Sequence, residues 1–408
     1  MSKYIPELRF KGFCENFEKF QLGQLGTFKN GMNMDKEDMG KGLPFVNLQD
    51  VFGNNVVNSS NLGLVNSSSN QREDYSLKSG DMLFIRSSVK PEGVGEAAVI
   101  EKTIPNATYS GFLIRFRAEK DIDNKFKRFI FSSSSIRSQI MKKATTSANT
   151  NINQDSLKLI NVFLPKLFEQ QKIGAFFKQL DDTIVLQQEL VVQQQQYKKA
   201  MLQKMFPQQG ECVPKVRFDG FSGNWVNQKI NSLVTPVVRE VPKPTESYKR
   251  LSVRSHAKGT FHQRVEDPST ISMDKLYVIK ENDLVVNITF AWEHAIAVAK
   301  KEDEGLLVSH RFPTFIIDKS DINFIHQLVS KENFRKKLDL ISPGGAGRNR
   351  VLNKRDFINL NVSVPKSLEE QQRIGDYLKQ LDDTIALHQK KLEDYQQLKK
   401  ALLQRMFV

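Results

Sequence analysis

The sequence predicts an α+β protein, with two mixed α+β domains joined by two long antiparallel helices that form a coiled coil, and with an internal pseudo-two-fold repeat. One observation behind this prediction is a duplicated segment, because KQLDDTI occurs at residues 178–184 and again at 379–385. Apolar residues around both copies advance in steps of three and four, as on one face of a helix. The rest of the sequence consists largely of short strand-like segments separated by loops.

The duplication extends well beyond that segment. Residues 162–206 align with 362–407, with one residue inserted after the Pro-Lys pair, and PELRFKGF near the start is repeated as PKVRFDGF in mid-chain. Between these landmarks the halves diverge, although YSLKSGDMLF at 75–84 is echoed by YVIKENDLVV at 277–286. We therefore place the first domain at residues 1–165, a central long helix at 166–206, the second domain at 207–365 and a C-terminal long helix at 366–408.

Each repeated block predicts one helix of about forty residues, or about 60 Å. SLEE at 367–370 is typical of a helix start, since its serine and glutamate can form a capping box. An apolar stripe of that length needs a partner, and the other copy is the obvious one. Because the linker at 207–214 is short, the second helix must run back along the first. The residues predicted to form the helix-pair interface are Ile173, Phe177, Leu180, Ile184, Ile374, Leu378, Leu381 and Ile385.

The divergent regions, about 18–160 and 226–360, contain strand-like segments such as DMLFIR and FLIRFR in the first and DLVVNI and FPTFII in the second. One helical stretch follows in each, at 124–144 and at 322–341. Each stretch leads into a loop of small residues, TTSANTNINQ or SPGGAGRNRVLN. This order of elements predicts a mixed α+β domain.

Composition favours a nucleic-acid partner. The formal net charge of +14, from 60 Lys and Arg against 46 Asp and Glu, points to a polyanion. An anionic membrane surface is disfavoured, because no amphipathic stretch rich in Trp and Lys and no membrane span is apparent. Two cysteines in 408 residues fit a reducing compartment, so we expect a cytoplasmic protein without a zinc-binding thiol cluster.

Catalytic motifs are missing from the sequence. GKG at 40–42 lacks the spacing of a phosphate-binding loop, and EGVGEAA at 92–98 lacks the third glycine of a nucleotide fingerprint. No Pro-Pro occurs, which excludes the motif that holds a flipped adenine in amino-methyltransferases. The doubled Asp181-Asp182 and Asp382-Asp383 are better explained as a solvated or salt-bridging helix face than as a carboxylate dyad. We expect no catalytic residues and no metal site.

The loops of both divergent regions carry residues suited to DNA. Arginine matches the edge of guanine, and asparagine or glutamine matches adenine. Clustering of such residues with lysine and serine on loops punctuated by glycine favours a DNA-binding role over isolated solvated residues. The predicted DNA-binding residues are Arg86, Ser87, Lys90, Asn149, Asn151 and Asn153 in the first domain, and Arg254, His256, Lys258, Arg264, Arg348 and Arg350 in the second.

Taken together, the doubled entry segment, the divergent domain and the long LDDTI helix resemble the specificity (S) subunits of type I restriction-modification systems over essentially the whole chain. The resemblance implies two target recognition domains, each reading one half of a bipartite, gapped site in the major groove of double-stranded DNA. It also implies that the helical pair sets the gap and docks two methyltransferase subunits, and that restriction and translocase subunits join them.

The resemblance further implies that catalysis belongs to partner subunits. S-adenosylmethionine is expected on the methyltransferase partner, and ATP and Mg on the restriction partner, so the chain has no cofactor of its own. Two alternatives stay open from the sequence, a self-contained methyltransferase-nuclease with degenerate motifs and a coiled-coil scaffold protein.

Overall fold

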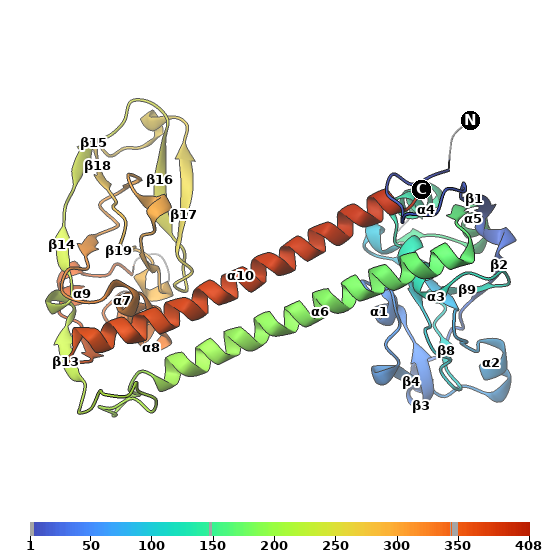
Figure 1. Ribbon diagram of the computed structural model, residues 1–408, viewed down its shortest axis with the longest axis horizontal. Helices are drawn as coiled ribbons and strands as arrows, with labels where there is room; N and C mark the ends of the chain where they lie inside the picture. Colours follow the sequence, from blue (N-terminus) through green and yellow to red (C-terminus); the bar gives the residue numbers. More distant parts are fainter. Residues whose placement is uncertain (1–3, 147–148, 343, 345–349) are drawn as a thin grey trace. The chain divides into compact units, whose positions relative to one another are not determined.

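The computed structural model describes residues 4–146, 149–342, 344 and 350–408. The chain divides into two compact units (Figure 1). The first unit contains Met1–Gln188 and Lys390–Val408, and the second contains Glu189–Gln389. Each unit therefore combines one α+β domain with the beginning of one long helix and the end of the other. No helix within the described residues is long and apolar enough to cross a membrane.

The elements of the first unit follow the predicted order of strands, helices and one long helix. They are β1 (Glu18–Gln21), η1 (Leu22–Gln24), β2 (Gly26–Asn30), η2 (Lys36–Asp38), β3 (Met39–Val46), α1 (Leu48–Val51), η3 (Ser59–Asn61), β4 (Gly63–Val65), α2 (Ser69–Asp74), β5 (Met82–Ile85), β6 (Ser87–Ser88), η4 (Pro91–Gly93), β7 (Ala97–Val99), β8 (Thr108–Tyr109), β9 (Leu113–Ala118), α3 (Asn124–Ile130), α4 (Ser134–Lys143), β10 (Thr145–Thr146), β11 (Thr150–Asn151), α5 (Gln154–Lys158), β12 (Asn161–Leu164) and the long helix α6 (Leu167–Lys204), which continues into the second unit.

The second unit repeats this order with differences in its middle. Its elements are β13 (Val226–Lys229), η5 (Ile230–Ser232), β14 (Thr235–Val237), β15 (Glu240–Pro242), β16 (Tyr248–Val253), β17 (Thr260–Val265), η6 (Pro268–Thr270), β18 (Lys275–Val278), β19 (Asp283–Val286), η7 (Ala291–Glu293), β20 (Ile296–Val298), η8 (Lys301–Asp303), β21 (Leu307–Val308), β22 (Thr314–Ile316), α7 (Ile322–Val329), α8 (Glu332–Leu340), α9 (Lys354–Ile358), β23 (Asn361–Val364) and the long helix α10 (Leu368–Met406), which ends in the first unit.

One sheet is common to both domains. Its strand order is β2-β9-β5-β7 in the first domain and β14-β22-β19-β20 in the second. A two-stranded ladder, β1 with β12 or β13 with β23, accompanies it in each case. The predicted α+β class and the internal repeat are therefore confirmed.

The central strand of this sheet separates two hydrophobic cores, because side chains alternate across a strand. In β5, Met82 and Phe84 face the core that contains the long helix, whereas Leu83 and Ile85 face a second core. In β19, Leu284 and Val286 likewise face the core that contains the long helix, whereas Val285 faces the second core. A strand buried on both faces explains why the sequence shows an unbroken apolar run there.

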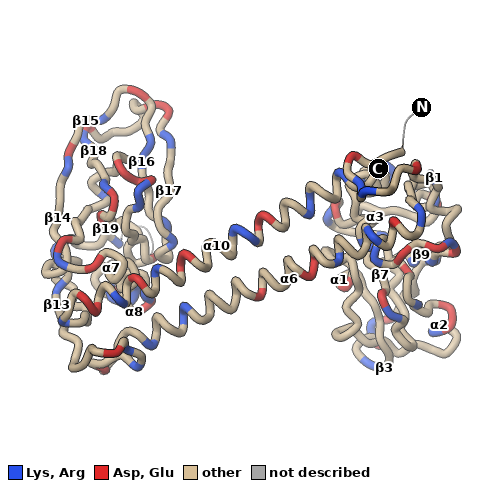
Figure 2. Tube along the Cα trace, viewed as in Figure 1, with Lys and Arg blue, Asp and Glu red and all other residues tan. Residues whose placement is uncertain are grey.

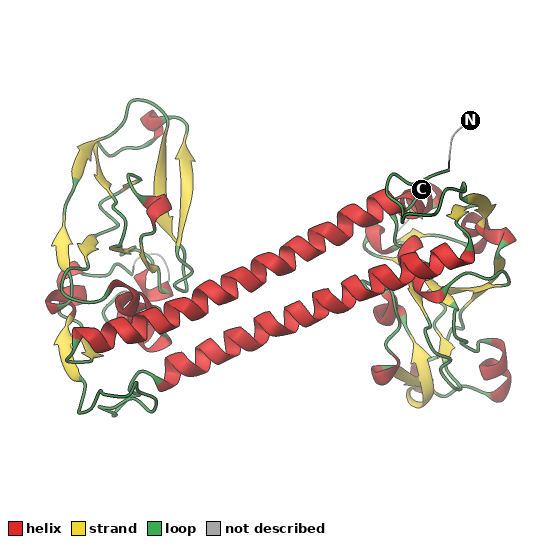
Figure 3. Cartoon of the chain, viewed as in Figure 1, coloured by secondary structure: helices red, strands yellow, loops and turns green. Residues whose placement is uncertain are grey.

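The second core of each domain is covered by a sheet that differs between the copies (Figure 3). In the first domain its strand order is β4-β3-β8, and in the second it is the larger β15-β18-β21-β16-β17. Variation between the copies is thus concentrated on one side of the central strand.

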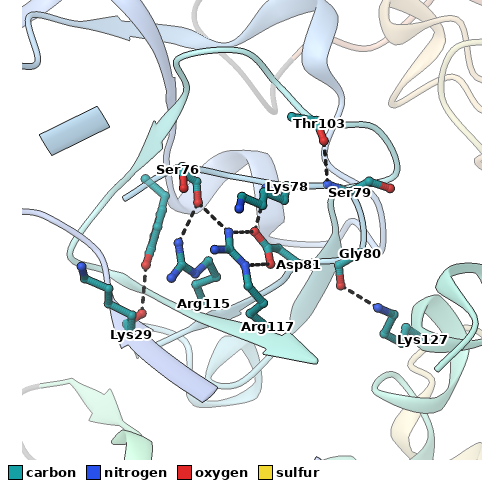
Figure 4. Close-up of polar contacts among 11 residues, drawn as sticks. Lys29, Ser76, Lys78, Ser79, Gly80, Asp81, Thr103, Arg115, Arg117 and Lys127 are labelled. Atoms are coloured by element: carbon teal, nitrogen blue, oxygen red, sulfur yellow. Dashed lines mark hydrogen bonds and ion pairs between the residues drawn. The ribbon is translucent and has the colours of Figure 1, made fainter. Parts of the chain in front are cut away.

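The turn before the central strand is fixed by a buried carboxylate (Figure 4). Asp81 accepts two hydrogen bonds from the guanidinium of Arg117, at 2.7 and 2.6 Å, and one from the backbone N–H of Lys78. The buried ammonium of Lys127 donates to the carbonyl of Gly80 at 2.7 Å, and burial lowers the pKa of Lys127 to about 8. In the second domain Asp283 has the same role, although Arg239 reaches it from the segment between β14 and β15.

Each domain is joined to its long helix by a repeated set of contacts. Glu169, which is almost fully buried in the first turn of α6, pairs with Arg9 at 2.6 Å. Glu370 in α10 pairs with Arg217 at 2.8 Å. The backbone N–H of Glu370 also contacts the Ser367 hydroxyl at 3.4 Å, which confirms the helix start predicted there. These arginines belong to the duplicated segments PELRF and PKVRF, so each copy of the segment attaches its domain to the start of one long helix.

A glycine on each long helix allows the domain to approach closely. An added Cβ would lie 2.6 Å from the backbone nitrogen of Phe126 at Gly174, and 2.6 Å from that of Phe324 at Gly375. These nitrogens belong to the first turns of α3 and α7, whose N-caps are Asp123 and Asp321. The start of a domain helix therefore rests directly on the long helix.

Each KQLDDTI segment forms one ion pair within its own helix and one ion pair with the other helix. Within the helices, Lys178 pairs with Asp182 at 2.6 Å and Lys379 with Asp383 at 2.5 Å. Between them, Asp181 pairs with Lys399 in the first unit and Asp382 with Lys198 in the second, each at 2.5 Å. Since both lysines occupy the same position of the repeat, each helix supplies one acid and one base, and the two helices are antiparallel in each unit (Figures 1 and 2). The carboxylates are salt-bridging, as predicted.

The residues predicted for the helix-pair interface have a broader role than the sequence suggested. Ile173 and Phe177 are buried in the core of the first domain, which also contains Met406 and Phe407 from the end of α10. Ile374 and Leu378 are buried in the equivalent core with Met205 and Phe206 from the end of α6, and Leu381 packs against it. Leu180 and Ile184 are partly buried, and Ile385 is buried. Domain, helix start and helix end thus share one core.

Replacing Gly174 or Gly375 by alanine tests this joint. Each substitution should lower the free energy of unfolding by about 1–3 kcal/mol, because the new methyl group overpacks a backbone contact. Gly63→Ala is the matched control, since the nearest atom there lies 3.7 Å from the new Cβ. Urea unfolding followed by circular dichroism measures the change. Equal effects at all three positions would contradict the close approach.

Candidate nucleic-acid interface

Pairing of two short strands brings together the residues that the sequence singled out in the first domain. In β6 and β11, Ser87 lies opposite Asn151 and Ser88 opposite Thr150. The backbone N–H of Ile152 donates to the carbonyl of Arg86 at 2.9 Å. The loop after the central strand and the loop of small residues therefore form one surface.

Side chains on this surface differ in how they are held. Arg86 and Lys90 are exposed, and the Lys90 ammonium lies 5.9 Å from the centre of the Phe52 ring. The side chain of Asn151 donates to the carbonyl of Asn149 at 2.8 Å. Asn153 is exposed but caps α5, because its oxygen accepts from the backbone N–H of Ser156. Asn153 thus has a structural role in addition to the predicted one.

The second domain builds the same surface from different residues. Leu352 donates to the carbonyl of Ile288 at 2.9 Å, which is the equivalent of the contact between Ile152 and Arg86. Arg350 lies in this loop, with its guanidinium 2.5 Å from Asp339 and 5.3 Å from the centre of the Trp292 ring. The predicted residue Arg348 lies outside the described residues.

The β16–β17 hairpin adds exposed basic residues to the second domain. Its tip docks on the η7 turn, where the backbone N–H of His256 donates to the carbonyl of Glu293 at 2.8 Å and the Ser255 hydroxyl donates to the carboxylate of Glu293 at 2.6 Å. Arg254 lies at this tip with its guanidinium 5.1 Å from the centre of the Phe261 ring, and Lys258 is exposed there. The hairpin register therefore places three of the predicted residues beside the loop of Arg350.

Arg264 is separated from that group. It lies at the other end of the hairpin, opposite Lys249, and pairs with Glu266 at 3.0 Å. The sequence grouped it with Arg254 because both belong to one short segment, but strand pairing places them at opposite ends. Arg264 is thus suited to a contact at a distance from the other three.

The η7 turn is held by a buried histidine. Burial lowers the pKa of His294, so its imidazole is neutral near pH 7, and Nε2 lies 2.6 Å from the carbonyl of Val329 in α7. His294 also has a positive φ of 67°, which lets the turn end sharply. The turn beneath the hairpin tip is therefore anchored to the domain helix.

Sequence reasoning missed several residues of these surfaces. Val89 and Phe112 have exposed fractions of 82% and 56% in the first domain, and Phe112 accepts from the N–H of Arg86 through its carbonyl. Trp292 lies under Arg350 in the second, and its indole N–H has no partner among the described residues. Exposed apolar groups can contact the methyl group of thymine. An apolar residue just after a buried strand was the available signal.

The arrangement supplies hydrogen-bonding groups and positive charge on two loop surfaces, which suits recognition of base edges and phosphates. Within residues 4–146, 149–342, 344 and 350–408, no cluster of three His, Cys, Asp or Glu residues is placed to hold a metal ion. The titratable side chains described near the loops, those of Glu293, His294 and Asp339, make contacts within the domain. Both loop surfaces therefore offer groups that suit contacts to DNA.

Comparison with known families identifies the class of protein. The family model of the type I restriction modification DNA specificity domain matches residues 14–193 and again 265–396. These matches cover most of the chain, so it belongs to this family, and the resemblance seen in the sequence is confirmed. The two domains described above are DNA-recognition domains of a type I restriction-modification specificity subunit.

Individual relatives agree with this assignment. The putative type I restriction enzyme MjaX specificity subunit of Methanocaldococcus jannaschii is 22% identical over 95% of each chain. The EcoKI specificity subunit of Escherichia coli is 29% identical over 40% of this chain and 35% of its own. Among solved structures, the S subunit from M. genitalium covers 99% of each chain at 13% identity with a TM-score of 0.60, and the HsdS subunit from Thermoanaerobacter tengcongensis covers 96% at 15% identity with a TM-score of 0.51.

Arg350→Ala and Asp339→Asn test whether the loop of the second domain depends on their contact. Both substitutions should lower discrimination among the bases that the second domain contacts by about 1–3 kcal/mol and leave those of the first domain unchanged. Arg350→Ala removes the guanidinium, and Asp339→Asn weakens the ion pair that holds it over Trp292. Methylation of single-base site variants by the assembled complex measures this.

Lys319→Ala removes an exposed positive charge of the same domain and serves as the control. If Asp339→Asn left discrimination unchanged while Arg350→Ala weakened all sequences equally, Arg350 would be a phosphate contact.

Proposed function

We propose that this chain is the non-catalytic subunit that gives a type I restriction-modification enzyme its sequence specificity. The first domain reads one half of a bipartite, gapped DNA site and the second domain reads the other. The observation that carries this proposal is the repeated loop contact, Ile152 to Arg86 and Leu352 to Ile288, which presents different side chains from the same frame. Two recognition domains that share this loop contact but expose different side chains suit two different half-sites.

The helical pair suits a second task. Its length fixes the separation of two readers, and so the length of the unread gap between half-sites. Because each helix start is repeated, the chain offers two similar surfaces, which suits docking of two methyltransferase subunits. Restriction and translocase subunits join that complex, with S-adenosylmethionine on the methyltransferase and ATP and Mg on the restriction subunit. Such an enzyme works on cellular DNA, so the chain acts in the cytoplasm.

Purified chain should transfer no methyl group to DNA and should direct methylation at one bipartite site once a methyltransferase subunit is added. Incorporation of labelled methyl groups and sequencing of the methylated DNA measure this. Methyl transfer by the highly purified chain alone would instead support a self-contained methyltransferase. Assembly with methyltransferase that modifies no defined site would favour a scaffold.

Residues 1–206 should form a homodimer that directs methylation of an inverted repeat of the first half-site. The core of the first domain needs Met406 and Phe407, and a second copy can supply Met205 and Phe206 at the equivalent positions. Gln187 and Gln194 replace apolar residues of the stripe, so this dimer should be less stable than the intact chain.

Light scattering and methylome sequencing of cells that express only residues 1–206 test this expectation. Phe206→Ala in the half-chain is the control, because it removes the exchanged ring and should abolish the dimer. Methylation of an asymmetric bipartite site would contradict the symmetry argument.

A further inference from the structure

The edge strand of the common sheet carries an aromatic ring in the first domain and a proline at the same register in the second. On the edge strand β2, Phe28 lies opposite Phe116, and their ring centroids are 5.0 Å apart. At the same register of the repeat, Pro236 on β14 lies opposite Phe315. Proline is much smaller than phenylalanine, so β14 supplies no ring to Phe315, whose ring packs instead against Phe357 of α9 with the centroids 5.1 Å apart.

A groove of about 300 Å³ lies at this place in the second domain. Its walls are largely apolar or aromatic, and include Pro236, Val238, Tyr277, Phe312, Phe315 and Ile358. Val238 stands at the rim with an exposed fraction of 74%. The size and lining fit one aromatic or branched apolar side chain supplied from outside.

The rim of this groove is basic. Lys354 and Arg355, in the first turn of α9, line it together with His310. Both α9 residues are exposed, and among the described residues no carboxylate lies within ion-pairing distance of either. Two unpaired positive charges beside an apolar groove favour a ligand that is apolar in one part and anionic in another.

The first domain shows the contrast at the equivalent positions. Gln154 stands in place of Lys354, and its side-chain amide, turned to the orientation that satisfies both atoms, donates to the carbonyl of Phe28 at 3.2 Å and accepts from the N–H of Asn30 at 3.1 Å. Asp155 stands in place of Arg355 and pairs with Lys158 at 3.0 Å. These positions are therefore internally satisfied in the first copy, whereas in the second they are exposed and positively charged.

We propose that this groove is a docking site for an acidic peptide segment of a partner protein. An aromatic side chain of the segment enters the groove beside Pro236, and flanking carboxylates pair with Lys354 and Arg355. Duplex DNA fits less well, because its phosphates could meet the two cations but would leave the apolar walls without a partner. Strand addition at this edge is disfavoured, since Pro236 has no N–H to donate.

This inference does not depend on which bases the two domains read. It is tested with the full-length chain and a panel of fluorescein-labelled synthetic peptides, each with one Phe, Tyr or Trp flanked by acidic residues. Fluorescence anisotropy should detect binding of a panel member to the wild type. A peptide with alanine for the aromatic residue, or lysines for the acids, should bind about ten-fold more weakly or worse.

Pro236→Phe should lower the affinity for the acidic aromatic peptide about ten-fold or more, because its larger ring would occupy the groove that Pro236 lines. Lys354→Glu with Arg355→Glu should do the same without touching the apolar walls. The matched control is Lys142→Glu with Lys143→Glu in the first domain, which changes the total charge equally and should leave peptide affinity within about two-fold.

Three outcomes would overturn the proposal. One is that no panel member binds the wild type more tightly than it binds Pro236→Phe. Another is that the control charge reversal weakens peptide binding as much as the reversal at Lys354 and Arg355, which would indicate attraction by overall charge alone. The third is that Pro236→Phe weakens binding of duplex DNA while peptide binding is unchanged, which would make the groove a DNA contact.

Discussion

The joint between each domain and its long helix is the constraint on which the other features depend. A glutamate in the first turn of the helix is removed from water and paired with an arginine from the entry segment. One turn later, a glycine lets the start of a domain helix rest on the long helix. Breaking a buried ion pair by removing one partner costs about 3–5 kcal/mol, so this register is strongly fixed. A reading surface on the domain thereby acquires a defined position along the helix of its own unit.

Division of each domain by its central strand explains how one framework carries two different outer sheets. The core on one side includes the start of one long helix and the end of the other. The core on the other side is smaller and belongs to the sheet that differs between the copies. Side chains of β5 and β19 alternate between the two cores. The sheet that covers one core can therefore differ between the copies, while the other core keeps its contacts with the long helices. The variable sheet of the second domain has been extended in this way without loss of the common one.

The repeated ion pairs between the long helices determine the relative direction of the two helices. An exposed ion pair contributes little to stability, about 0–1 kcal/mol. Asp181 and Asp382 nevertheless occur at one position of the repeat and meet lysines that also share one position. An antiparallel arrangement satisfies both pairs at once, whereas a parallel one would bring acid toward acid. The two ion pairs therefore specify that the helices are antiparallel, although they add little to the stability of the helix pair.

The duplication, the helix lengths and the α+β class could all be predicted from the sequence. Periodicity and repetition are local signals, and Ile173, Phe177, Ile374 and Leu378 are buried as the apolar stripe indicated. Several candidate DNA-binding residues were also identified from residue type, since arginine and asparagine on loops carry recognition chemistry wherever they lie. The partners of Arg9 and Arg217 could not be predicted, because their glutamates lie 160 and 153 residues away in the sequence.

Long-range pairing decided the rest. Strand register separated Arg264 from Arg254, although the sequence places them close together, and it brought the tip of the hairpin to the loop of Arg350 through η7. Register also revealed that Pro236 occupies the position of Phe28, which no alignment of so divergent a region could establish from the sequence. The sequence by itself determined which segments are helix, strand and repeat, because those depend on neighbours along the chain. Only the tertiary structure decided which side chains share a surface, because that depends on pairings between segments far apart in the sequence.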